Sequence, residues 1–147
     1  MTNIVLVGFK RSPFTIANKG LLAGVRPEDI LSQVINDLIK TTNINKDDIE
    51  DIIAGCAYPE GAQGYNIAKI VSFMTGMPEH VGGMTINRWC GSSMQAIHSA
   101  AGAISMNAGK VFICCGIESM TSVPINGLNY SPHPELLKDQ PNVYLSM

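Results

Sequence analysis

Charged residues are scarce in this chain, and no run of Lys or Arg occurs. They make up 15% of the 147 residues and give a formal net charge of −2, so a nucleic-acid backbone meets no basic segment. Long apolar runs are lacking too, because the longest stretches, near residues 4–7, 52–54 and 111–115, are far shorter than the roughly 18 residues of a membrane span. The first residues carry no basic or apolar leader pattern. We therefore predict a cytoplasmic protein without a membrane or nucleic-acid partner.

Motifs for metals and phosphates are also lacking. The four cysteines show neither a CxxC pair nor the spacing of a zinc site, so we expect reduced thiols and no metal. No segment matches the glycine-rich loops GxGxxG or GxxxxGK[ST] of nucleotide-binding proteins. The acidic group Asp47, Asp48, Glu50 and Asp51 is interpreted as the solvated start of a helix. Disorder is excluded by the 46% of hydrophobic residues.

What the sequence does contain is an alternation of strand and helix patterns. Apolar runs typical of strands lie at residues 4–7, 51–57, 81–87 and 111–115. Helical spacing of apolar residues predicts helices over 27–41, 65–75 and 91–107. This alternation predicts an α/β fold with a mostly parallel sheet and helices on its faces. Past Glu118 the pattern becomes irregular, apart from one helical turn at 135–138.

The predicted helix over residues 91–107 has an unusual composition. Serine, alanine and glycine fill most of its positions, which leaves it thin and without a charged face. We expect such a helix to be buried or packed against a close neighbour.

Cys90 lies where the third predicted strand meets this thin helix. A thiol at a helix N-terminus faces free backbone N–H groups and the positive end of the helix dipole, which favour the thiolate. A helix end alone stabilises the thiolate too little to bring the thiol pKa down to about 7. Arg88 or an imidazole therefore has to supply the remaining stabilisation. The alternative reading, an inert buried cysteine, applies better to Cys56, Cys114 and Cys115, which lie in or near apolar strands.

The three histidines offer no obvious base for this thiol. His98 is eight residues further along the helix, about 12 Å from Cys90, and we interpret it as structural. His80 and His133 lie in loops with no visible partner.

At Cys90 the residues carry a family resemblance, in the run Asn87-Arg88-Trp89-Cys90-Gly91-Ser92-Ser93-Met94-Gln95-Ala96-Ile97. This run resembles the nucleophile motif of the thiolases, which make and split 3-oxoacyl-CoA. Other segments follow in the family's order: Arg11-Ser12-Pro13-Phe14, Gly55-Cys56-Ala57, Gln63-Gly64-Tyr65-Asn66-Ile67-Ala68, and Gly116-Ile117-Glu118-Ser119-Met120 before Val123-Pro124.

The resemblance implies a thiolase-like layered fold. Residues 1–118 would form part of the N-terminal domain, and residues 119–147 would begin the loop domain. Cys90 would be the nucleophile that carries the acyl group as a thioester, with its own N–H as one oxyanion donor. The implied enzyme is an acetyl-CoA C-acetyltransferase that forms or cleaves acetoacetyl-CoA. The alternative is a 3-ketoacyl-CoA thiolase of fatty-acid degradation.

The resemblance also implies partners. Coenzyme A thioesters would be the substrates, with no cofactor. The chain would form a homodimer or homotetramer, paired through the strand over residues 81–87.

Departures from the family pattern are of two kinds. Ser93 and Cys115 stand where the family usually has glycine, and we expect both to be accommodated. More importantly, the 147 residues contain no Asn-Glu-Ala-Phe or Gly-His-Pro, and their one Cys-x-Gly match, Cys114-Cys115-Gly116, falls in a predicted strand. The resemblance places the activating histidine and the acid/base cysteine further along the chain. We therefore also consider a truncated or split-gene product that is inactive alone. A ketosynthase-like enzyme is disfavoured, because its cysteine lies in a Thr-Ala-Cys-Ser-like context.

Overall fold

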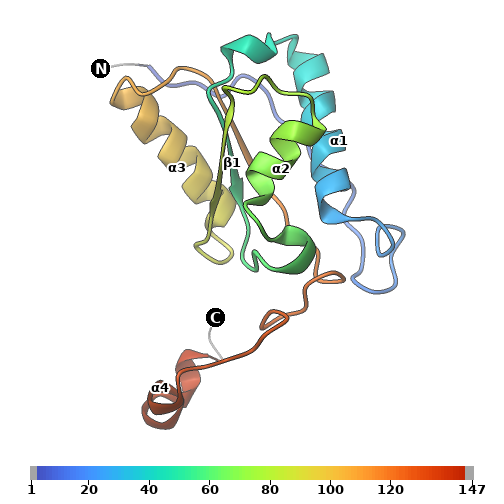
Figure 1. Ribbon diagram of the computed structural model, residues 1–147, viewed down its shortest axis with the longest axis vertical. Coiled ribbons are helices and arrows are strands. Elements are labelled where there is room, and N and C mark those ends of the chain that lie inside the picture. Colours follow the sequence, from blue (N-terminus) through green and yellow to red (C-terminus); the bar gives the residue numbers. More distant parts are fainter. Residues whose placement is uncertain (1–2, 145–147) are drawn as a thin grey trace.

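The computed structural model describes residues 3–144, which form a small parallel sheet between helices (Figure 1). The strands are β1 (Asp51–Gly55), β2 (Gly82–Ile86) and β3 (Phe112–Gly116), in the order β2-β1-β3 and all parallel. The helices are α1 (Pro27–Thr42), α2 (Ile67–Met74), α3 (Ser92–Ser105) and α4 (Pro134–Asp139). Single 3₁₀ turns lie at Lys46–Asp48, Gly61–Gln63 and Pro141–Val143. The α/β prediction is confirmed, and the strands over 51–57, 81–87 and 111–115 are each found within two residues of their predicted ends.

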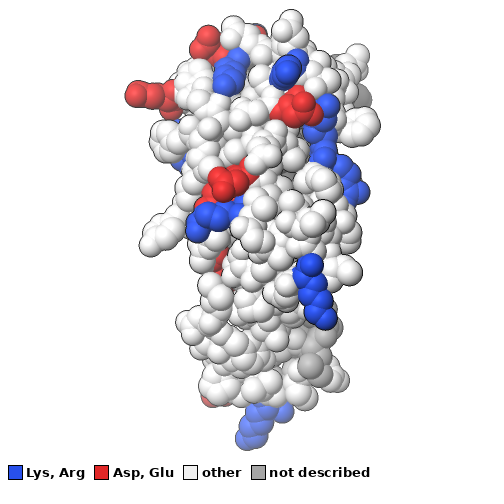
Figure 2. Space-filling view, turned by 90° about the vertical axis from the view of Figure 1, so that its right-hand side faces the viewer, with Lys and Arg blue, Asp and Glu red and all other residues white. Residues whose placement is uncertain are grey.

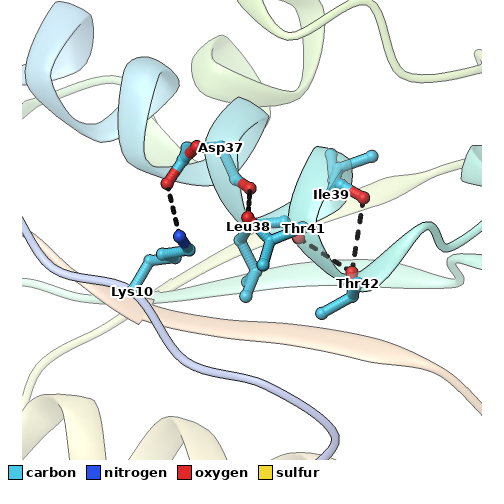
Figure 3. Close-up of polar contacts among 6 residues, drawn as sticks. All are labelled: Lys10, Asp37, Leu38, Ile39, Thr41 and Thr42. Atoms are coloured by element: carbon cyan, nitrogen blue, oxygen red, sulfur yellow. Dashed lines mark hydrogen bonds and ion pairs between the residues drawn. The ribbon is translucent and has the colours of Figure 1, made fainter.

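Helix α1 begins and ends where its sequence predicts. Pro27 occupies its first turn together with Glu28 and Asp29, and Asn43 ends it in the left-handed conformation that asparagine tolerates. At its last turns, the Thr41 hydroxyl donates to the Asp37 carbonyl at 2.7 Å, and the Thr42 hydroxyl to the Leu38 carbonyl at 2.8 Å (Figure 3). These bonds satisfy the polar groups of two β-branched residues that favour helices only weakly.

The two faces of the sheet are covered differently. Even-numbered positions of β1 point toward α1 and α2, where a large cluster of aliphatic side chains is buried: Leu31, Ile35, Ile49, Ile52, Ala54, Ile67, Ala68, Val71, Met77, Val81 and Ile113. Odd-numbered positions point toward α3, where the buried hydrophobic side chains are Ile53, Ala96 and Ala100. We call these the aliphatic face and the α3 face.

Helix α3 lies very close to the sheet. A Cβ atom at Gly55 would overlap the backbone of Ser92 and Ser93, and one at Gly116 would overlap the Ser93 hydroxyl. The missing side chains at the ends of β1 and β3 therefore let the first turn of α3 touch the sheet. The expected burial of the thin helix is only partly confirmed, because its one buried face consists of Ser92, Ala96 and Ala100.

The predicted strand over residues 4–7 is wrong. The structure describes no helix or strand between residues 3 and 26, and Val5, Leu6 and Val7 are 74–81% exposed. The segment runs beside α1, where the Lys10 ammonium lies 2.8 Å from the Asp37 carboxylate (Figure 3). A β-branched run forms a strand only where another strand supplies hydrogen-bond partners, and no strand described here pairs with it.

After β3 the chain leaves the sheet. The Ile117 N–H still donates to the Gly55 carbonyl, and Val123 is fully buried, but α4 lies away from the sheet (Figure 1). Helix α4 confirms the predicted helical turn at 135–138, and the proposed domain boundary at residue 118 stays a prediction. Within residues 3–144, no helix combines the length and apolar composition needed to cross a membrane. The face drawn in Figure 2 shows acidic and basic residues interspersed, with wide uncharged areas between them.

Candidate active site

Cys90 lies at the edge of the sheet where the carboxyl ends of all three strands meet. In parallel sheets this edge is where ligands bind. Cys90 sits in the connection between β2 and α3, two residues before the helix begins, and its side chain is exposed. The sequence placed it at a strand–helix junction, and the structure confirms that position.

The turn that carries Cys90 has an uncommon backbone. Trp89 has a φ of 50°, a left-handed conformation that costs a bulky residue of the order of 1–2 kcal/mol. Asn87 Oδ1 accepts the Trp89 N–H at 2.9 Å, and the Ser92 hydroxyl donates to the Trp89 carbonyl at 2.6 Å. The Tyr58 ring meets the Trp89 ring edge-on, with centroids 5.2 Å apart. These contacts hold the residue before Cys90 in a conformation that it would not adopt alone.

Arg88 makes contacts that the sequence did not predict. Its Nη1 donates to Gln95 Oε1 at 2.5 Å, one turn into α3, and its N–H donates to the Ser92 hydroxyl at 2.8 Å. Arg88 therefore braces the first turn of α3. That its charge helps to stabilise a Cys90 thiolate stays a prediction.

The other three cysteines lie in environments that suppress the thiolate. Burial, reinforced by the nearby Glu118 carboxylate, raises the pKa of Cys56 to about 12. Burial likewise raises the pKa of Cys115 to about 12, with a further contribution from Cys114. The pKa of Cys114 is raised by burial and then by the charge of Asp51. The interpretation of these three residues as packing residues is supported, and Cys90 is the exposed thiol among the four.

The two unusual residues of the family motifs fit their surroundings. Ser93 faces Gly116, which has no side chain to collide with. The Cys115 thiol donates to the Ile53 carbonyl at 3.6 Å and packs beside the aliphatic cluster.

The histidines lie on three different segments of the fold. His98 is exposed on α3, two turns into the helix, and His80 is exposed just before β2. His133 caps α4, where its Nδ1 accepts the Leu136 N–H at 3.4 Å.

Sequence reasoning missed a polar network beneath the Cys90 turn. Glu118, after β3, accepts the Ala57 N–H at 2.7 Å and the Gln63 side-chain N–H at 2.9 Å. Gln63 is fully buried and also donates to the Tyr58 carbonyl at 2.9 Å. Asn87 completes the network by donating to the Ala57 carbonyl at 2.8 Å. The available signal was that Asn87 and Glu118 closely follow the ends of two of the three strands.

A cleft of about 270 Å³ opens beside the same turn. Its walls include the aromatic rings of Tyr58, Trp89, Tyr130 and Tyr144, and Asn87 lies on its rim. Cys90 itself is not among the residues that line this cleft, but its neighbour Trp89 is. Among residues 3–144, no three His, Cys, Asp or Glu side chains are grouped to hold a metal ion.

Comparison with known proteins agrees with this arrangement. The family model described as the N-terminal domain of thiolase matches residues 4–140. The chain belongs to the thiolase family. It is 38% identical over 134 residues to a 3-ketoacyl-CoA thiolase of Aeromonas salmonicida (strain A449), and 37% identical over 147 residues to one of Bacillus subtilis (strain 168). These alignments cover 90% and 100% of this chain.

A solved thiolase structure confirms the fold. The crystal structure of the Bacillus anthracis acetyl-CoA acetyltransferase matches 80% of this chain with a TM-score of 0.75 and 30% identity. The thiolase-like layered fold predicted from the sequence is therefore confirmed. The chain spans only 35–38% of the two curated relatives and 29% of the solved chain.

Proposed function

We propose that this chain provides the nucleophile of a thiolase, and that Cys90 is the residue that becomes acylated. The observation that carries the proposal is the position of this exposed thiol. It stands on a constrained turn, at the carboxyl edge of a parallel sheet and next to the start of α3. The other three thiols are packed against the strands, with raised pKa values.

The proposed reaction proceeds in two steps. Cys90 Sγ attacks the carbonyl carbon of an acyl-CoA, a new thioester bond forms, and the bond to the CoA sulfur breaks; the thiol proton leaves with free CoA. The α-carbon of acetyl-CoA then loses a proton and attacks the acyl carbon, the bond from that carbon to Cys90 Sγ breaks, and the proton returns to the sulfur. The products are the 3-ketoacyl-CoA and the free thiol. Thiolysis is the reverse. The Cys90 N–H, close to the positive end of α3, would be one donor to the oxyanion.

The acyl group is a narrower proposal. Acetyl transfer, with acetoacetyl-CoA as the condensation product, is supported by the name of the solved structural match at 30% identity. Longer 3-ketoacyl-CoA substrates are supported by the names of the curated relatives at 37–38% identity. Both use coenzyme A thioesters as substrates and need no further cofactor. A cytoplasmic location also remains a prediction from the sequence.

We propose that catalysis needs groups beyond these 147 residues. Gly-His-Pro does not occur in them, and their one Cys-x-Gly match, Cys114-Cys115-Gly116, lies in β3, where burial raises the pKa of both thiols. Each absent acid or base is worth about 10²–10⁴ in rate, and a missing oxyanion donor about 10²–10³. The 147-residue polypeptide by itself should therefore show no measurable thiolysis.

The test compares this polypeptide with a completed one. Acetoacetyl-CoA and a longer 3-ketoacyl-CoA are assayed with the 147-residue chain, and then with a chimera. The chimera continues it with the part of the Bacillus subtilis relative that lies beyond the aligned region. We expect turnover only from the chimera, and none from a chimera with Cys90→Ser. Turnover by the short chain alone, or by the Cys90→Ser chimera, would reject the proposal.

We also propose a homodimer, or a homotetramer built from it, that pairs through β2. This strand is an edge of the described sheet. Gly82 and Ile86 bond toward β1, so the backbone groups of Gly83 and Thr85 point away from β1. The Gly83 carbonyl accepts the Asn66 side-chain N–H at 2.7 Å, a bond that pairing would have to replace or retain. A monomer at micromolar concentration in light scattering, from a chain that is folded by circular dichroism, would count against this pairing.

A further inference from the structure

A chain of hydrogen bonds connects Glu118 to the residue before Cys90. The Glu118 carboxylate accepts the Ala57 N–H at 2.7 Å. The carbonyl of the same Ala57 accepts the Asn87 side-chain N–H at 2.8 Å. Asn87 Oδ1 in turn accepts the Trp89 N–H at 2.9 Å. The path therefore crosses from the end of β3, through the end of β1, to the turn after β2.

A second path runs through the buried Gln63. Its amide nitrogen donates to Glu118 Oε1 and to the Tyr58 carbonyl, both at 2.9 Å, and its amide oxygen accepts the Ser119 N–H. Tyr58 then places its ring edge-on against Trp89. Both paths thus end on Trp89, the left-handed residue that sets the direction of Cys90.

We propose that Glu118 and Asn87 are positioning residues for Cys90. They hold the turn so that the thiol stays at the positive end of α3. The inference rests on the proposed role of Cys90 as the acylated nucleophile. Neither side chain is required to touch the substrate, because each acts through Ala57 and Trp89.

The chemistry of Glu118 makes a sharp substitution available. Its two oxygens both accept N–H groups, from Ala57 and from Gln63. In Glu118→Gln, one oxygen becomes an amide that only donates, so one of these two N–H groups loses its acceptor. Gln63 cannot correct this by rotating its amide, because its oxygen accepts the Ser119 N–H. The turn should then loosen.

The sign of the effect separates positioning from simple electrostatics. Removing the negative charge of Glu118 by itself favours a nearby thiolate and speeds alkylation. Loosening the turn takes the thiol away from the helix end and slows alkylation. A helix end contributes a factor of about two to five in favour of the anion, so we expect Cys90 to react about threefold more slowly in Glu118→Gln.

The experiment measures the rate of iodoacetamide addition to Cys90 in the whole 147-residue chain, by mass mapping, from about pH 6.5 to about pH 9.5. Glu118→Gln, Asn87→Ala and the double variant are compared with the unaltered chain. Glu60→Gln is the matched control, since its carboxylate also accepts a backbone N–H, from Leu128 at 2.7 Å, but is not part of this path. Labelling of Cys114 and Cys115 monitors general loosening of the fold.

We expect both single variants to slow the reaction of Cys90 and Glu60→Gln to leave its rate unchanged. Only one of the two paths runs through Asn87, so the double variant should be slower than Asn87→Ala, but by less than the product of the two single effects. Cys114 and Cys115 should stay protected throughout. The proposal is overturned if Glu118→Gln reacts at the original rate or faster, if Glu60→Gln slows Cys90 equally, or if the two single effects multiply.

A further variant covers the case in which Glu118→Gln does not fold. In Asn87→Ser the hydroxyl can still accept the Trp89 N–H, but it is too short to reach the Ala57 carbonyl. An unchanged Cys90 rate in this variant also overturns the proposal. If the chimera is inactive but the variants still slow the reaction of Cys90, only the proposed function is rejected. If the chimera is active but the variants leave the Cys90 rate unchanged, only the positioning role is rejected.

Discussion

The two faces of the sheet differ in what their helices contribute. On the aliphatic face, α1 and α2 bury a continuous cluster in which Ile52, Ile67 and Val71 are fully inaccessible. On the α3 face the buried hydrophobic cluster has only three residues, and neighbours such as Met84, Ile86 and Phe112 are only partly buried. The first face has the composition of a stabilising core. The second has small residues that allow a close helix.

This difference shows how the fold separates stability from the site. Large side chains hold helices at a distance and supply the area that stabilises the domain. Small residues on α3, with Gly55 and Gly116 opposite them, bring the helix N-terminus directly onto the strand ends. Cys90 and its turn lie at this contact, so the face with the least buried area carries the reactive group.

The largest expected effect is in thiol reactivity. Thiols with a pKa of about 12, as for Cys56 and Cys115, are ionised roughly a thousandfold less than at the ordinary 9.0. In the folded chain, limiting iodoacetamide should therefore modify Cys90 more than about a hundredfold faster than these two. Mass mapping of the adducts measures the ratio, and in urea the four rates should converge. Preferential modification of Cys56, Cys114 or Cys115 in the folded chain would contradict the assignment of Cys90.

The next effect compares the same truncation on each face. Ile52→Ala removes a fully buried side chain from the aliphatic face and should lower the free energy of unfolding by about 2–5 kcal/mol. Ile86→Ala, on the partly buried α3 face, should cost about 1 kcal/mol. Urea unfolding followed by circular dichroism measures both. Equal losses would mean that the α3 face is as well packed as the other.

A third comparison places the same substitution at Gly55, which contacts α3, and at Gly102, which lies inside α3. Gly55→Ala puts a methyl group into the backbone of Ser92 and Ser93, and should cost about 1–3 kcal/mol by pushing the helix away. Gly102→Ala, inside α3, meets nothing within 4 Å and should stabilise the chain by up to about 1 kcal/mol. Thermal unfolding gives the sign of each change. Two changes of the same sign would contradict the close approach described here.

The smallest expected effect concerns the carboxylate on the α3 face. Burial raises the pKa of Asp51 above its ordinary 3.8, against the lowering effects of the Ile52 N–H and Lys69. The folded state therefore holds this proton more tightly than the unfolded state, and stability is lost as the pH rises from 3.8 through the folded pKa. Asp51→Asn should remove this loss.

The measurement is urea unfolding of Asp51→Asn and the unaltered chain at about pH 4 and about pH 7. The advantage of the variant should be greater at the higher pH. An advantage that is independent of pH, or greater in acid, would show that ionised Asp51 is not penalised by the fold.

Much of the fold was readable from local pattern. The apolar spacing of residues 27–42 and the proline and acids at its start predicted α1 to within one residue. The run over residues 4–7 failed for a physical reason, since its β-branched composition favours an extended backbone but does not supply a partner strand. Cys90 could be identified because its strand–cysteine–helix junction spans only a few consecutive residues, and a thiol at a helix N-terminus has a recognisable chemistry.

The sequence by itself determined the order of strands and helices, the parallel sheet and the junction that carries Cys90, because these depend on periodicity and on neighbours along the chain. Only the tertiary structure decided that Glu118, Gln63 and Asn87 meet beneath the Cys90 turn, and that Arg88 turns to Gln95. Those contacts join segments that are as much as 61 residues apart. Their geometry is set by how closely α3 packs onto the strand ends, a distance that no local pattern contains.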